Sequence, residues 1–179
     1  MFVEEMESIL KGWTFLSLNI QGKSGGLLLG WKSRFFHLLN AWGVGSGLCA
    51  SLFSLELNLD VCLVNIYGPY IDKEVFWKNL LDLDCMKCEK LILGGDLNFT
   101  MGLSEIWGFR ARLDSLSDFF TKILETYGLV DITPTVMIPT WTNRRTDNEI
   151  ICKRLDRFLL LADMLDYEFF LSSVGWQWW

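Results

Sequence analysis

A carboxylate and a carboxamide follow a buried strand at residues 91–98, which read Leu-Ile-Leu-Gly-Gly-Asp-Leu-Asn. Side chains alternate between faces along a strand, so we expect Asp96 and Asn98 to point in the same direction. The glycines let other groups approach the backbone closely. A carboxylate can bind a hard divalent cation or orient a water, and an amide can donate to a phosphate oxygen. This combination suits phosphodiester hydrolysis, although Asp and Asn also stabilise ordinary turns after strands.

Three further segments carry side chains of the same chemical kind. Tyr67 lies at a strand end, and its phenol could donate to a phosphate oxygen in a transition state. Residues 128–132 and 139–143 form a second segment, and the third contains Arg154 and Asp156, which we expect on one face of a strand. Each segment could be structural by itself, for example through a core tyrosine with a satisfied hydroxyl. Their order and spacing make the joint set informative.

The charge of the chain is acidic overall and uneven along the sequence. A net charge of −6 argues against tight electrostatic binding of nucleic acid, which depends on Lys and Arg neutralising phosphates. Basic residues nevertheless gather in two places, and they are Arg110, Arg112, Arg144, Arg145, Lys153, Arg154 and Arg157. A local basic rim can hold a phosphate, which makes Arg154 and Arg157 candidate substrate-binding residues. A solvated loop is the alternative interpretation.

The elements that must position these side chains follow from hydrophobic periodicity and turn residues. Helices are predicted over the first ten residues, after a cap at Asp72, and between a cap at Asp114 and a stop at Gly128. Further strands are predicted at 13–20, 27–31, 48–57, 60–67, 129–132, around Trp141 and at 152–160. The pair 48–57 and 60–67 reads as a hairpin. No linker separates these segments, and 179 residues suit one domain.

Several classes of protein are disfavoured. Charged residues interrupt every apolar run that could span a bilayer, and the acidic start lacks the order of a signal peptide, so we expect an intracellular protein without membrane contact. Gly22-Lys23-Ser24 lacks the earlier glycine of a phosphate-binding loop, because that position is Ser17, so no nucleotide cofactor is expected.

The five cysteines predict no disulfide framework. Cys85 and Cys88 have the spacing of a metal knuckle, but no second pair with that spacing occurs. The single histidine, His37, lies in an apolar segment. Ordinary packing of the cysteines is therefore favoured over a zinc site.

Taken together, the motifs resemble the endonuclease/exonuclease/phosphatase superfamily. Within it, the chain is most similar to the endonuclease domain of plant non-LTR retrotransposons, and the segment 107–120 fits that branch well. The matching segments are Ser24–Leu29, Tyr67–Pro69, Gly94–Asn98, Leu129–Asp131, Thr140–Trp141 and Arg154–Leu159. The resemblance covers nearly the whole chain. It implies an α/β four-layer sandwich, deoxyribonuclease-like, in which two packed β-sheets are flanked by helices.

The resemblance also implies roles for individual residues. Asp96 would orient or deprotonate the attacking water and is the candidate ligand of Mg²⁺ or Mn²⁺, and Asn98 would position the phosphate and that water. Tyr67 would contact the phosphate, and Asp156 would orient a histidine. DNA is the expected partner, with a nuclear location by analogy only. Tyr70 stands where relatives often carry an Asn, which puts one phosphate contact in doubt.

The same resemblance implies two absences. We expect residues 1–179 to form a single domain that lacks the first strand region, with its metal-binding Glu, and the C-terminal Ser-Asp-His region with the catalytic histidine. Endonuclease activity would then be weak or absent, and residues 169–179 would be the exposed remainder of an interrupted core. The alternatives are a functional nuclease of which this sequence is a part, and a non-catalytic remnant that binds nucleic acid or protein. The oligomeric state stays open.

Overall fold

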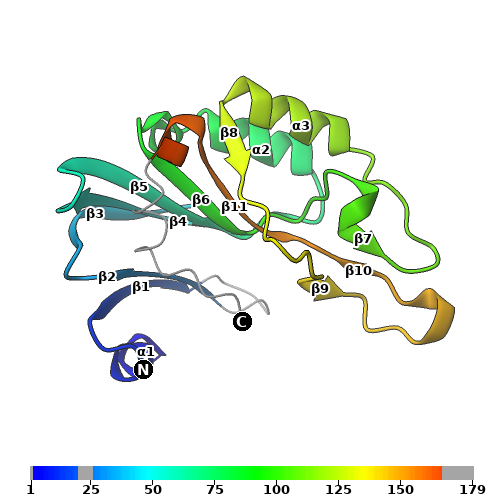
Figure 1. The fold of residues 1–179 in the computed structure, drawn as a ribbon, viewed down its shortest axis with the longest axis horizontal. Helices are drawn as coiled ribbons and strands as arrows, with labels where there is room; N and C mark the ends of the chain where they lie inside the picture. Colours follow the sequence, from blue (N-terminus) through cyan, green and yellow to red (C-terminus); the bar gives the residue numbers. More distant parts are fainter. Residues whose placement is uncertain (1, 20–25, 167–179) are drawn as a thin grey trace.

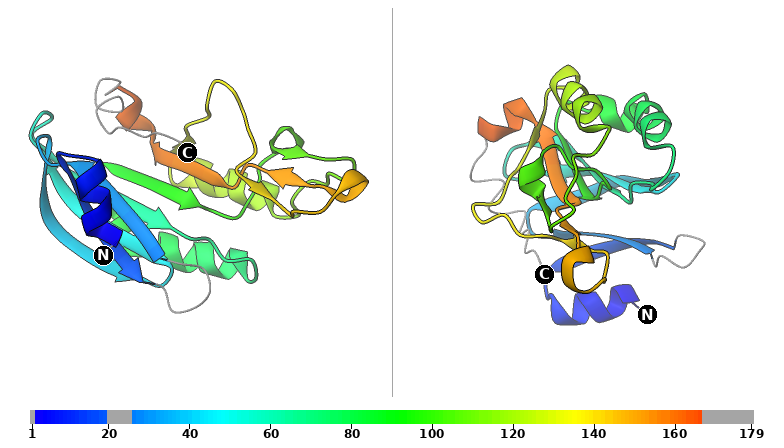
Figure 2. Two further views of the ribbon diagram at one scale, coloured as in Figure 1. Left: turned by 90° about the horizontal axis from the view of Figure 1, so that it is seen from below. Right: turned by 90° about the vertical axis from the view of Figure 1, so that its right-hand side faces the viewer.

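The structure is a computed structural model that describes residues 2–19 and 26–166, and these residues form four layers (Figure 1). The outer layers are helical, and their members are α1 (Phe2–Ile9), α2 (Lys73–Leu81) and α3 (Ser117–Thr126). Figure 1 and the right-hand view of Figure 2 show α2 and α3 on one side of the larger sheet and α1 beyond the smaller sheet. The fold class predicted from the sequence, two packed sheets flanked by helices, is confirmed.

The larger sheet has six strands in the order β3-β4-β5-β6-β11-β8. Their bounds are β3 (Phe36–Val44), β4 (Gly47–Ser54), β5 (Leu59–Ile66), β6 (Leu91–Asp96), β8 (Leu129–Asp131) and β11 (Asp156–Leu161). All neighbours are antiparallel except β5 and β6, which are parallel and are connected through α2. The central strands are mainly apolar because helices cover one face of the sheet and the second sheet covers the other.

The second sheet is the antiparallel pair β1 (Trp13–Asn19) and β2 (Gly26–Lys32). A small third sheet has the order β7-β10-β9, with β7 (Ile106–Trp107), β9 (Trp141–Thr142) and β10 (Cys152–Lys153). Short 3₁₀ helices lie at Asp84–Lys87, Leu103–Glu105, Asp147–Glu149 and Ala162–Asp166. No helix in the described ranges is both long and apolar enough to cross a membrane.

Two hydrophobic cores hold the layers together, one on each face of the six-stranded sheet. The helix-side core centres on Trp77 of α2 and on Phe99 and Phe120, whose rings stack at 3.9 Å. The core between the sheets contains Trp31 of β2 and Leu63 of β5 among its buried side chains.

The predicted helices form, but their ends differ in detail. Asp72 precedes α2 with φ 55 and makes no side-chain cap, so the predicted capping role of Asp72 is wrong. Asp114 does accept the Leu116 N–H at 3.1 Å, although α3 begins only at Ser117. Gly128 has φ +62, a left-handed conformation that ends a helix readily, as predicted.

Other predictions differ from the structure or lie outside it. Strand β3, which carries His37, was not predicted, and the strand expected at 152–160 is divided into β10 and β11. The segment Gln21–Ser24, with its Gly-Lys-Ser, and the predicted exposed end at 169–179 lie outside the described residues.

Candidate active site

Asp96 and Asp156 meet where two neighbouring strands begin and end. Asp96 is the last residue of β6 and Asp156 is the first residue of β11, and the antiparallel register places them directly opposite each other. Opposed residues of antiparallel strands project on the same face with Cβ atoms about 5 Å apart. The structure therefore brings two of the predicted catalytic carboxylates together.

The electrostatics of this pair are unusual for aspartates. Burial, reinforced by the negative charge of Asp156, raises the pKa of Asp96 from its ordinary value of 3.8 to about 6. The backbone N–H of Asn98, 3.1 Å from Asp96 Oδ1, and the charge of Lys73 oppose this rise only in part. A carboxylate with a pKa near 6 can accept a proton close to neutral pH.

The two glycines before Asp96 are required by close contacts. Gly95 has φ +123, and a Cβ there would lie 2.2 Å from the carbonyl oxygen of Ile66 on β5. A Cβ on Gly94 would lie 2.4 Å from the ring of Phe158 on β11. Since larger residues would push either neighbour away, the Gly-Gly pair keeps β5, β6 and β11 close at this end of the sheet. The close approach expected from the sequence is present.

Asn98 ties the segment after β6 to the segment after β5. Its side-chain N–H donates to the carbonyl oxygen of Gly68 at 2.8 Å, and the residue is 3% exposed with φ 59. The N–H of Gly68 in turn donates to the backbone oxygen of Asp96 at 2.6 Å. This donor of Asn98 is therefore engaged within the protein, and Asn98 fixes the turn that follows Tyr67.

Tyr67 is half-buried at the margin of the core between the sheets. Its hydroxyl donates to the hydroxyl of Tyr70 at 3.4 Å, and the two rings meet edge to face. Gly68, the next residue, is bonded to both Asp96 and Asn98. The turn that carries Tyr67 is thereby fastened to the strand end that carries Asp96.

Arg154 and Arg157 lie in a buried cluster of four charges. Arg154 makes a bidentate pair with Asp131 at 2.7 and 2.9 Å and reaches Glu105 at 3.1 Å. Arg157 donates to the same two carboxylates, at 2.6 Å to Asp131 and in a short contact with Glu105. Two positive and two negative charges balance, as enclosed ions require.

The two arginines are 2% and 0% exposed, so their guanidinium groups face the protein interior and not a basic rim. Arg157 also lies over the ring of Phe99 at 4.8 Å, which joins the cluster to the helix-side core. Through Asp131 and Glu105 the cluster connects β8, β11 and the segment after β6. The sequence predicted Arg154 and Arg157 on an exposed rim that binds substrate, whereas the structure places both side chains in the interior.

Two residues of this region were missed as site residues by sequence reasoning. Glu105 was not singled out, and its only sequence signal is an acidic side chain directly before the apolar pair Ile106-Trp107. Thr140 was noted only as part of a motif. Its hydroxyl oxygen accepts the N–H groups of Leu155 and Asp156 at 3.0 Å each, which fixes the backbone where β11 begins.

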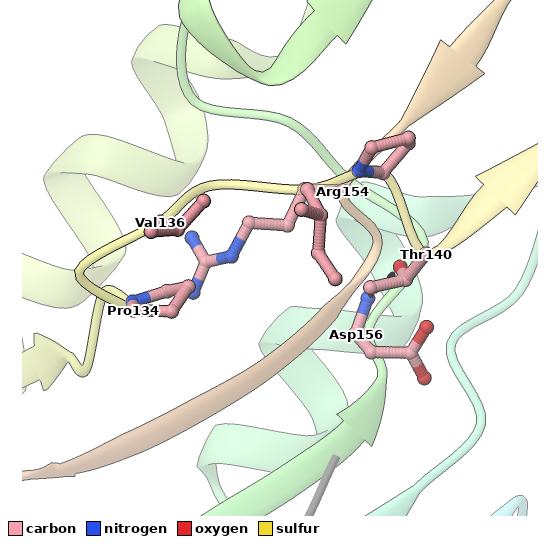
Figure 3. Close-up of a pocket in the computed structure, with 7 residues that line it drawn as sticks. Pro134, Val136, Thr140, Arg154 and Asp156 are labelled. Atoms are coloured by element: carbon pink, nitrogen blue, oxygen red, sulfur yellow. Dashed lines mark hydrogen bonds between the residues drawn. The ribbon is translucent and has the colours of Figure 1, made fainter. Parts of the chain in front are cut away.

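A cavity of about 380 Å³ opens beside Asp156 (Figure 3). Its lining residues are Pro134, Val136, Ile138, Pro139, Thr140, Arg154 and Asp156. In Figure 3 the Arg154 side chain extends towards Pro134, whereas the carboxylate of Asp156 points away from that guanidinium. Arg154 and Asp156 thus both line the cavity. The charge of Arg154 is neutralised within the cluster, whereas Asp156 is not a member of that cluster.

The carboxylate pair suits a hard divalent cation. Mg²⁺ is commonly held by one or two carboxylates together with waters and substrate phosphate oxygens. Asp96 and Asp156 supply such a set, and a cation would neutralise the negative charge of Asp156 that, after burial, raises the pKa of Asp96. Among residues 2–19 and 26–166, no group of three or more His, Cys, Asp or Glu side chains is arranged to hold a metal ion. His37 lies on β3, separated from β11 by three strands.

No family model matches this chain, and no curated protein matches it. Solved structures do. The endonuclease domain of TRAS1, a telomere-specific non-LTR retrotransposon, superimposes with a TM-score of 0.66 at 16% identity, over 88% of this chain and 71% of that domain. The catalytic domain of human nocturnin gives 0.57 at 12% identity, over 90% and 64%. Zebrafish (D. rerio) TDP2, solved with a single-strand DNA product, gives 0.56 at 14% identity, over 89% and 66%.

These likenesses establish the fold. The chain has the deoxyribonuclease-like fold of endonuclease/exonuclease/phosphatase proteins, and it spans slightly less than two thirds of the nocturnin and TDP2 domains. The carboxylate pair lies at one end of the strands of its larger sheet, where β6 ends and β11 begins.

Proposed function

We propose that this protein binds DNA and hydrolyses phosphodiester bonds with the help of Mg²⁺ or Mn²⁺. The observation that carries the proposal is the opposed pair Asp96 and Asp156, in which the pKa of Asp96 is raised, at one end of the central strands of a deoxyribonuclease-like fold. The likeness to the TRAS1 domain supports an origin in a non-LTR retrotransposon, and a nuclear location belongs to the same proposal.

In the proposed reaction, Asp96 orients the attacking water and accepts its proton. In the protein without a bound cation, the pKa of Asp96 is about 6, so Asp96 is largely ionised at pH 7.5 and can accept a proton. Asp96 and Asp156 would hold the metal ion, which supplies charge neutralisation at the phosphate oxygens when bound. Asp156 keeps its orientation because Thr140 fixes its backbone N–H.

The other predicted residues divide into contact and positioning roles. The Tyr67 hydroxyl is proposed to donate to the phosphate after leaving its long 3.4 Å contact with Tyr70. Asn98 positions that tyrosine through Gly68. Arg154 and Arg157 are proposed as positioning residues, because their buried ion pairs fix the strand that carries Asp156.

We further propose that turnover is slow. Asp156 is expected to orient a histidine, but the one histidine of the chain is His37, exposed on the far edge strand β3. A general acid or base contributes roughly 10²–10⁴-fold to a rate. Nicking by residues 1–179 alone should therefore fall by about that factor below that of an enzyme with the full set of groups.

The test is nicking of supercoiled plasmid with Mg²⁺, Mn²⁺ or EDTA. We expect slow, metal-dependent nicking that is lost in Asp96→Asn and in Asp156→Asn. Asp60→Asn is the matched control, since Asp60 is exposed on β5 away from the pair, and this variant should nick like the parent. Nicking that persists in EDTA, or in both site variants, would contradict the proposal.

Binding of DNA without cleavage is a second candidate function. Arg110 and Arg145 are each 65% exposed beside Glu149, and Arg144 is exposed in the connection between β9 and β10. Such side chains can contact phosphates. If a labelled duplex binds, is never nicked, and is released by Arg144→Gln with Arg145→Gln but not by Asp96→Asn, this second function replaces the first.

A further inference from the structure

Four of the five cysteines gather on the helix side of the six-stranded sheet. Cys49 of β4, Cys62 of β5 and Cys85 belong to the helix-side core, and Cys88 packs against it. The register pairs Cys49 with Val64, two residues after Cys62, so Cys49 and Cys62 are diagonal neighbours on one face. The fifth, Cys152, lies on β10 in another sheet. Packing cysteines were expected from the sequence, but a group of four from three segments was not.

Within this group the thiols are arranged in two pairs. Cys49 lies beside Cys85, and Cys62 lies beside Cys88, close enough in each case for one thiol to influence the pKa of the other. The backbone holds the second pair in place, because the Cys62 N–H donates to the oxygen of Lys90 at 2.8 Å and Cys62 is in parallel register with Leu91. Cys88 lies just before this junction, at the end of a 3₁₀ turn.

The two pairs differ in their access to solvent. Cys49 and Cys85 are 0% and 4% exposed, so a dissolved oxidant cannot reach either sulfur. Cys62 is equally buried, but its partner Cys88 is only half-buried. Oxidation of a thiol depends on access as well as on thiolate character, so Cys88 is the point of entry.

We propose that Cys62 and Cys88 form a redox-sensitive pair that a hydroperoxide converts to a disulfide. The Cys88 thiol attacks the peroxide O–O bond and becomes a sulfenic acid, and the peroxide leaves as an alcohol, or as water from hydrogen peroxide. The Cys62 sulfur then attacks the Cys88 sulfur and displaces its hydroxyl, which leaves as water with the proton of Cys62. Two electrons pass from the two thiols to one peroxide.

The disulfide would join β5 to the segment that leads into β6. These are the two strands whose other ends carry Tyr67 and Asp96. A crosslink between residues 62 and 88 restricts the unfolded chain, so the oxidised protein should melt at a temperature higher by about 5 °C. This inference is independent of the proposed nuclease activity, since it concerns the opposite end of the strands.

The experiment is peptide mapping of the full chain after brief treatment with hydrogen peroxide under native conditions and alkylation of the remaining thiols. Trypsin cleaves after Lys87 and separates Cys85 from Cys88, and a glutamate-specific protease cleaves after Glu56 and separates Cys49 from Cys62. We expect one crosslinked species that joins the peptides of Cys62 and Cys88 and disappears with dithiothreitol. A Cys85–Cys88 crosslink, or a sulfinic acid on Cys88 without a crosslink, would overturn the proposal.

Variants add a second readout. In Cys62→Ala, Cys88 should accumulate as a sulfenic acid that a dimedone probe labels, because its resolving partner is gone. In Cys49→Ala, a matched core substitution, the Cys62–Cys88 crosslink should still form. Equal labelling of Cys88 in the parent protein and in Cys62→Ala would contradict the pairing, and the map of the parent decides the question if either variant fails to fold.

Discussion

The carboxylate pair and the four-charge cluster lie side by side on β11, yet they are built on opposite principles. Asp156 faces Asp96 and adds to the burial that raises the pKa of Asp96, a rise that the charge of Lys73 opposes only in part. Arg157, the next residue, is instead enclosed among Asp131, Glu105 and the ring of Phe99. Alternation along the strand separates the two environments. The two like charges of the carboxylate pair suit it to chemistry, and the balanced charges of the four-charge cluster suit it to holding the neighbouring strand in place.

The largest expected effect comes from unbalancing the cluster. Asp131→Ala leaves Arg157 and Arg154 buried with one carboxylate between them, which should lower the free energy of unfolding by about 3–5 kcal/mol. Urea denaturation followed by tryptophan fluorescence measures it, with Asp60→Ala, on the exposed surface, as the control. A loss below about 1 kcal/mol would mean that the cluster does not hold the site.

Next in size is the loss of the hydroxyl that fixes the start of β11. Thr140→Val removes the acceptor of the Leu155 and Asp156 N–H groups and should cost about 1–3 kcal/mol. Thr140→Ser keeps the oxygen and is the matched control. The comparison is sharpened if nicking falls more in the Val variant than its stability loss explains, since the substitution also releases Asp156.

The pH dependence of stability distinguishes the two regions further. Because the pKa of Asp96 is about 6 in the fold and near 3.8 in the unfolded chain, the folded protein binds more protons between these values. Its stability should therefore fall as the pH rises from about 4 to about 6, by about 1–2 kcal/mol after solvent screening.

Asp96→Asn should lack this decline, and the measurement is urea denaturation of both proteins across that pH range. Parallel curves of stability against pH for the parent and Asp96→Asn would show that folding does not raise the pKa of Asp96. The carboxylate pair would then not be the unbalanced charge environment that distinguishes it from the four-charge cluster.

The smallest expected change in stability belongs to Tyr67→Phe. The contact of this hydroxyl with Tyr70 is long, at 3.4 Å, so its loss should alter the free energy of unfolding by less than about 1 kcal/mol. If that hydroxyl donates to the phosphate, nicking should nevertheless fall by about 100-fold. Tyr70→Phe serves as the control, and equal losses in both variants would argue against a specific role for Tyr67.

The sequence predicts the features of the fold that depend on local residue patterns. The strand that ends at Asp96 and the tight approach at Gly94 and Gly95 follow from an apolar run and small residues, and α3 follows from its amphipathic period and from Gly128. The recognition of recurring motifs supplied the layer arrangement, which no periodicity could give.

What sequence reasoning missed depends on tertiary partners. Nothing local shows that Arg154 and Arg157 turn inward, because their exposure is decided by Glu105, which lies 49 and 52 positions away. Strand β3 escaped prediction because its centre is largely exposed and does not alternate, with a bulge between Leu38 and Asn40. Asp72 looked like a cap by residue type, but its left-handed backbone directs the helix start without its side chain.

The central claim is that Asp96 serves chemistry and the neighbouring cluster serves structure. The most direct measurement compares Asp96→Asn with Asp131→Asn, recording Mg²⁺-dependent plasmid nicking and the free energy of unfolding at pH 7.5 on the same preparations. We predict that Asp96→Asn abolishes nicking and keeps or raises stability, whereas Asp131→Asn lowers stability. Nicking retained in Asp96→Asn, or a stability loss there as large as in Asp131→Asn, would contradict the claim.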